Sequence, residues 1–73
     1  MTFKTWYRKV ETIAASNVDP DWDLPVDNIE GWNAFDWQAC FDAEWEPQMA
    51  VLEFACEHED MFRAFLRKNG RLR

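Results

Sequence analysis

Apolar residues recur at helical spacing near the start of the chain, and this pattern limits the fold more than any other feature. Counted from residue 3, they fall at i, i+3, i+4, i+7, i+10 and i+11, which is one stripe of an α-helix. The stripe consists of Phe3, Trp6, Tyr7, Val10, Ile13 and Ala14. With Thr2 as its expected N-cap, a helix over residues 3–16 must bury this stripe against the rest of the domain.

Residues 17–26 interrupt the helical pattern. Pro20 and Pro25 lack the backbone N–H that a helix needs, and three aspartates lie in the same segment. Apolar residues alternate with polar ones here, so we expect some of them to fold back on the core. The segment is therefore predicted to be an irregular acidic connection.

A second helix is expected to follow this connection and to end near Glu44. Asp27 and Glu30 stand at the spacing of a capping box, with Asp in the place of Ser or Thr. Because Gly31 weakens the first turn by roughly 1 kcal/mol, the alternative start of this helix is Asn33.

A third helical stretch begins at Pro47, because proline suits a first turn, and ends at the strong stop formed by Asn69 and Gly70. An unbroken helix of that length would measure about 33 Å, longer than the roughly 28 Å expected across the domain. The polar run at residues 57–60 therefore favours a break, with Asp60 capping a short fourth helix. We predict an all-α fold in which residues 1–73 form a single domain. It is a small bundle of three or four helices with short links and an irregular acidic loop after the first helix.

Positive and negative charges are segregated along the chain. All 14 acidic residues lie between Glu11 and Asp60, and all 8 basic residues lie outside that interval. No Lys or Arg occurs from Val10 through Phe62, whereas a typical domain intersperses both signs. With a net charge of −6, the chain is not expected to bind nucleic acid or an anionic membrane directly. Four helices would bring the two basic ends together, whereas three would place them at opposite ends.

Two interpretations of this charge layout are open. In one, the acidity only keeps the protein soluble. In the other, the acidic body docks on a basic surface of another protein, as a DNA mimic would, because such a surface attracts phosphate charge. Short, acidic, aromatic-rich and helical, the chain is similar in kind to many small phage and mobile-element inhibitors, which implies an inhibitory, counter-defence role. The candidate partner-binding residues are Asp21, Trp22, Asp23, Asp27, Glu30, Asp36, Trp37, Phe41, Asp42, Glu44 and Trp45.

The second expected helix carries two apolar stripes. One of them aligns Trp37, Phe41 and Trp45 at i, i+4 and i+8. A central helix packed on both sides accounts for this pattern. Alternatively, the stripe is exposed and forms a binding hot spot or a homodimer seam. The alternative function is therefore a structural or assembly protein that self-associates through this aromatic face.

The acidic connection also resembles an EF-hand calcium loop over the window of residues 19–30. Carboxylates occupy positions 1, 3, 5, 9 and 12 of this window, in the order Asp19, Asp21, Asp23, Asp27 and Glu30. Val26 supplies the apolar residue at position 8, but Leu24 replaces the Gly that allows the sharp turn, and no second loop pairs with it. A degenerate calcium-loop protein is the third function considered, and no metal or cofactor is expected.

Catalysis and a disulfide framework have little support. Cys40 and Cys56 lie among apolar residues, which predicts buried thiols, with a disulfide between facing helices as the alternative. On a helix, His58 points about 200° away from Cys56, so the two cannot share a metal ion. We also predict no enzyme activity for this chain. The N-terminus lacks a signal-peptide pattern, and no apolar run reaches about 18 residues, so we expect a cytoplasmic protein.

Overall fold

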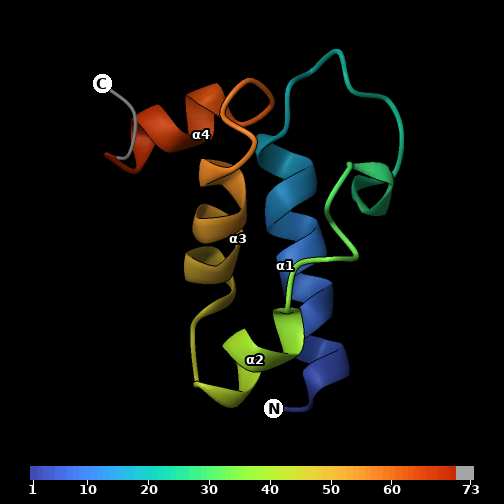
Figure 1. The fold of residues 1–73 in the computed structure, drawn as a ribbon, viewed down its shortest axis with the longest axis vertical. Helices are drawn as coiled ribbons and strands as arrows, with labels where there is room; N and C mark the ends of the chain where they lie inside the picture. The colour runs from blue at the N-terminus through green and yellow to red at the C-terminus, as the bar shows by residue number, and fades with distance from the viewer. Residues whose placement is uncertain (71–73) are drawn as a thin grey trace.

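The fold consists of four α-helices and one short 3₁₀ helix, described by a computed structural model over residues 1–70. In chain order these are α1 (Phe3–Asn17), η1 (Val26–Asn28), α2 (Trp37–Asp42), α3 (Pro47–Cys56) and α4 (Arg63–Lys68). No strand occurs within the described residues, so the predicted all-α class is confirmed. Figure 1 shows α1 and α3 side by side and running in the same direction, with α2 near one end and α4 at the other.

The first helix forms where the apolar stripe predicted it. Thr2 caps α1, and its hydroxyl oxygen accepts a hydrogen bond of 3.3 Å from the backbone N–H of Thr5. Trp6, Val10 and Ala14 are buried, and α1 contacts α3 more extensively than any other helix. Since α1 and α3 run in the same direction, the chain between them returns along the side of the molecule to the starting end of α1 (Figure 1).

The expectation of a helix from Asp27 or Asn33 to Glu44 is wrong. The chain instead forms η1, then a series of turns, and only then the short α2. Gly31 has a positive φ of 88°, which lies outside the helical region. Its carbonyl oxygen accepts hydrogen bonds from the N–H groups of Ala34 and Phe35. This turn redirects the backbone, so the apolar residues on either side of it belong to different elements.

The capping residues of this region also differ from those predicted. The capping box at Asp27 is wrong, because η1 starts after Pro25, whose ring offers no acceptor atom. Asp36 caps α2 instead, with its carboxylate accepting a hydrogen bond of 3.0 Å from the N–H of Ala39. An acidic residue predicted to bind a partner therefore also stabilises a helix start.

The third helical stretch divides as predicted, with α3 beginning at Pro47 and α4 following a turn after Cys56. The N-cap position of α4 is taken by Phe62, so the expectation that Asp60 caps this helix is wrong. Asp60 instead forms an ion pair of 3.5 Å with Arg63, in which both side chains are exposed. α4 and the N-terminus lie at opposite ends of the molecule (Figure 1), so four helices do not bring the basic residues of α4 to the start of α1. Arg71 and Arg73 lie outside the described residues.

Aromatic side chains from the turns after η1 and from α2 fill the centre of the core. Trp32 is fully buried, and its ring centroid lies 5.1 Å from that of Phe54 and 4.6 Å from that of Trp37. The indole N–H of Trp32 donates a 2.7 Å hydrogen bond to the hydroxyl of Tyr7. The indole N–H of Trp37 donates a 2.9 Å hydrogen bond to the carbonyl oxygen of Trp32. These polar groups are thus satisfied inside the core, as burial requires.

Candidate protein-binding surface

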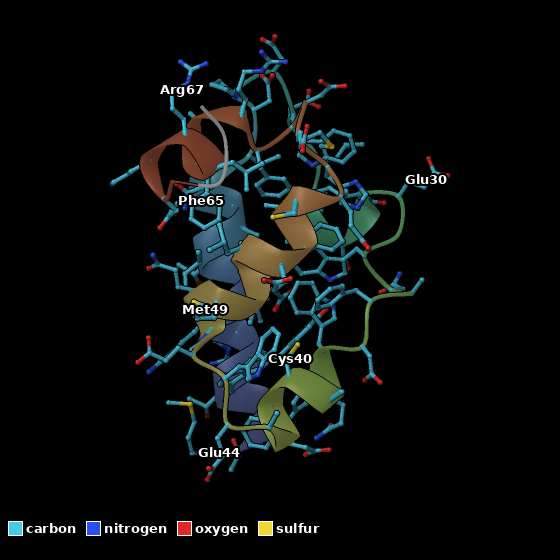
Figure 2. The ribbon with its side chains drawn as sticks, turned by 60° about the vertical axis from the view of Figure 1, so that its left-hand side comes forward. Glu30, Cys40, Glu44, Met49, Phe65 and Arg67 are labelled. Atoms are coloured by element: carbon cyan, nitrogen blue, oxygen red, sulfur yellow. The ribbon has the colours of Figure 1, made fainter. Side chains whose placement is uncertain are left out.

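Seven of the predicted site residues are carboxylates, and all seven are exposed. We call this set the acidic band: Asp21, Asp23, Asp27, Glu30, Asp36, Asp42 and Glu44. The segments that carry them follow one another from the end of α1, past η1, to the far end of α2 (Figure 1). In Figure 2 the labelled side chains of Glu30 and Glu44 point outward, one at the side and one at the lower end of the molecule.

The charge of the acidic band is not neutralised by neighbouring side chains. None of its seven carboxylates takes part in an ion pair within residues 1–70. Asp36 accepts a 3.0 Å hydrogen bond from the N–H of Ala39. Asp42 accepts a 2.9 Å hydrogen bond from the side-chain amide of Gln38. Both donors are uncharged. The exposed basic side chains of the described residues belong to α1 and α4. The segments that carry the band, from Asp21 to Glu44, thus contain seven like charges and no basic residue.

The three aromatic residues predicted to form one stripe lie in different surroundings. Trp37 is 5% exposed and packs in the core, with its ring centroid 4.3 Å from that of Phe35. Phe41 is half-buried and packs on Phe3 at a centroid distance of 5.5 Å. Trp45 lies beyond the end of α2 and is 40% exposed. The alternative of one exposed helical stripe is therefore wrong, and Trp37 packs in the core as the first interpretation predicted.

Trp22 lies where the connection meets the turn between α3 and α4, beside a backbone hydrogen bond made by Asp19. It is half-buried, and the backbone N–H of Asp19 donates a 2.7 Å hydrogen bond to the carbonyl oxygen of Met61 on that turn. A hollow of about 360 Å³ lies here, lined by Asp19, Asp21, Trp22, Asp60 and Met61. Asp60 is thus brought close to one end of the acidic band. The sequence offered no signal for this, because no local pattern links residues so far apart in the chain.

The predicted calcium window does not form a cage of ligands. Asp19 uses one carboxylate oxygen to accept a 2.9 Å hydrogen bond from the N–H of Asp21, a turn that aspartate commonly makes. Within residues 1–70, no group of three or more His, Cys, Asp and Glu side chains is placed to hold a metal ion. In the described structure the Asp19 carboxylate therefore stabilises the loop.

Both cysteines are free thiols, Cys40 buried and Cys56 half-buried, so the disulfide alternative is wrong. Burial raises the pKa of the Cys40 thiol above its ordinary range, and the nearby carboxylates of Asp36 and Glu53 raise this pKa further. Cys40 is therefore protonated at neutral pH and behaves as a small apolar residue of the core.

The chain gives no match in comparisons with protein-family models, curated proteins and solved structures. Among the described residues, none of the helices is both long and apolar enough to cross a membrane.

Proposed function

We propose that this chain is a small acidic protein-binding module that acts in the cytoplasm. It docks the acidic band on a basic surface of a partner protein, one that otherwise contacts nucleic acid or another polyanion. By occupying that surface it inhibits the partner, in the manner of phage and mobile-element counter-defence proteins. The observation that carries the proposal is the set of seven exposed carboxylates without an ion-pair partner in residues 1–70.

Free carboxylates on a surface suit this function for two physical reasons. Their summed potential steers a positively charged partner toward the band and raises the association rate. Since they are not paired within residues 1–70, binding does not first have to break an internal ion pair. No Lys or Arg occurs from Val10 through Phe62 to offset this potential along the chain.

The burial of Trp37 weakens the alternative of self-association through an aromatic helix face. That alternative needs Trp37, Phe41 and Trp45 on one exposed stripe, and the first of these is a core residue. Two copies meeting through the acidic band would also bring like charges together, which costs free energy. The electrostatic docking function is therefore preferred.

Charge reversal on the acidic band tests this proposal. Asp27 and Glu30 are exposed and hold no capping position, whereas Asp36 caps α2 and its replacement would change helix stability as well as charge. The immobilised protein and its Asp27→Lys/Glu30→Lys variant are used to capture partners from a lysate of the host cell. The captured protein is then purified, and its affinity for both forms is measured at low and high salt.

We expect the double variant to bind the partner at least about tenfold more weakly and with a flatter salt dependence. Duplex DNA is expected to compete with the wild-type protein for the partner. The matched control is Glu11→Lys/Glu59→Lys, which changes the net charge equally but lies outside the band, and should weaken binding much less. Equal loss in both variants, or binding that survives high salt, contradicts docking through the acidic band.

A further inference from the structure

The turn between α2 and α3 presents an aromatic ring to solvent. Trp45 is 40% exposed, more than any of the other four tryptophans. Met49, in the first turn of α3, is 44% exposed, a second large apolar side chain close to this turn in the chain. Every other aromatic ring of the described residues is buried or half-buried against the core, so Trp45 is the exception.

Hydrogen bonds fix the backbone of this turn. The N–H of Glu44 donates to the carbonyl oxygen of Phe41, and the N–H of Trp45 donates to that of Cys40, both at 3.0 Å. This pair of bonds is the Schellman motif that ends many helices. The carbonyl oxygen of Trp45 accepts a third bond, of 2.8 Å, from the indole N–H of Trp6 on α1. The indole of Trp45 therefore extends from a backbone that is already ordered before any partner binds.

The residue at the left-handed position of this motif is unusual. Glu44 has a φ of 63°, where glycine is the common choice. A side chain with a Cβ costs roughly 1–2 kcal/mol in this conformation. Strain of this kind is often retained where the side chain has a function. The strained position here supplies a carboxylate directly before the exposed indole.

The two neighbours of Trp45 in the sequence are both glutamates, and both are exposed. Neither Glu44 nor Glu46 makes an ion pair within residues 1–70. An exposed indole whose two sequence neighbours carry free carboxylates matches the chemistry of an arginine side chain. The guanidinium stacks on the ring and donates hydrogen bonds in its plane to a carboxylate. Lysine, a compact and strongly hydrated point charge, fits this combination less well.

We propose, building on the function proposed above, that Trp45 anchors the docking surface by receiving an arginine of the partner. The guanidinium stacks on the Trp45 indole and donates hydrogen bonds to the carboxylate of Glu44 or Glu46. A purely apolar partner surface fits this site less well. It would remove water from the two carboxylates without offering them hydrogen-bond donors. A second copy of this chain is also a poorer occupant, because it would bring the same glutamates against each other.

Two synthetic peptides, oligoarginine and oligolysine of equal length, test the anchor. Their dissociation constants are measured by calorimetry at low salt for wild type, for Trp45→Ala and for the control Leu24→Ala. Leu24 is an exposed apolar residue of the connection, far from Trp45 in the sequence, and so tests for the loss of any exposed apolar side chain. We expect wild type and Leu24→Ala to prefer oligoarginine by about fivefold, and Trp45→Ala to lose most of this preference. An unchanged arginine preference in Trp45→Ala overturns the anchor.

Glu44→Gly provides a second variant that separates binding from folding. Glycine relieves the strain at the positive φ, so thermal stability should rise while affinity for oligoarginine falls by several-fold. A more stable variant with unchanged affinity also overturns the role of this carboxylate. The Asp27→Lys/Glu30→Lys variant should weaken both peptides and keep the preference for arginine. If neither peptide binds wild type, the proposed function itself is wrong, whereas binding without arginine preference rejects only the anchor.

Discussion

The indole N–H of Trp6 donates a 2.8 Å hydrogen bond to the backbone carbonyl oxygen of Trp45. This bond joins the first turns of α1 to the turn between α2 and α3, which are 39 residues apart in the chain. Since Trp6 is 3% exposed, its donor has no ready access to water if the bond is lost. The position of the Trp45 turn therefore depends on a residue that does not itself reach the surface.

Replacing Trp6 with Phe should destabilise the domain while keeping an aromatic ring in the core. The variant loses the bond to the Trp45 carbonyl oxygen and part of the ring volume, and we expect a loss of about 1–3 kcal/mol. Urea unfolding followed by circular dichroism measures this change. Trp45→Ala serves as the comparison, because it keeps the backbone carbonyl and should cost less than Trp6→Phe. The reverse order would contradict the structural role of this bond.

Truncating Trp37 should affect folding and not binding alone. Its ring lies among Trp32, Phe35 and Phe54 in the core, so Trp37→Ala should cost about 3–5 kcal/mol. That loss is comparable with the whole stability expected of a domain of this size, on the order of 5 kcal/mol. Loss of helicity in the far-ultraviolet spectrum checks it. A folded Trp37→Ala with altered self-association would instead restore the exposed-stripe alternative.

Asp36 should show a capping effect that is separate from its charge. Asp36→Ala removes the acceptor of the Ala39 N–H and should cost about 1 kcal/mol of stability. Asp36→Asn removes the same charge but keeps a side-chain acceptor, so it should be close to wild type in thermal melting. Equal destabilisation by both substitutions would show that charge, and not the cap, is responsible.

The two thiols should differ in reactivity. Cys40 is buried and its raised pKa leaves little thiolate at neutral pH, whereas Cys56 is partly accessible. Iodoacetamide should therefore modify Cys56 first, as followed by mass spectrometry of the peptides. Because the pKa of Cys40 is raised, its labelling should increase only at a pH above the ordinary thiol range. Urea should make the two rates similar, and fast labelling of Cys40 in the folded protein would contradict its burial.

The features that the sequence predicted correctly are set by local chemistry. The stripe in α1, the cap at Thr2, the start of α3 at Pro47 and the break before α4 all follow from residues close together in the chain. Each depends on helical periodicity, on a side-chain acceptor or on the missing N–H of proline. The exposure of the band carboxylates was also predictable, because carboxylates are rarely buried unpaired.

The prediction of the second helix was wrong because its apolar residues belong to two different elements of the structure. Trp32 and Trp37 have helical spacing relative to other apolar residues, yet the turn at Gly31 places them in different elements around one core. Periodicity alone cannot distinguish a helix from a compact series of turns whose side chains all point inward. The positive φ of Glu44 could not be predicted either, because the residue at this position is not a glycine.

The shared direction of α1 and α3 bears on the rate at which the chain folds. Helices joined by a short loop pair as soon as that loop closes, but here residues 18–46 lie between them. Loop-closure entropy must be overcome before such distant contacts become favourable, which slows folding relative to helical domains with local contacts. Trp32 contacts both Tyr7 of α1 and Phe54 of α3. We therefore expect the contacts of Trp32 to form in the transition state of folding. Substitutions at Trp32 should then slow refolding more than they speed unfolding.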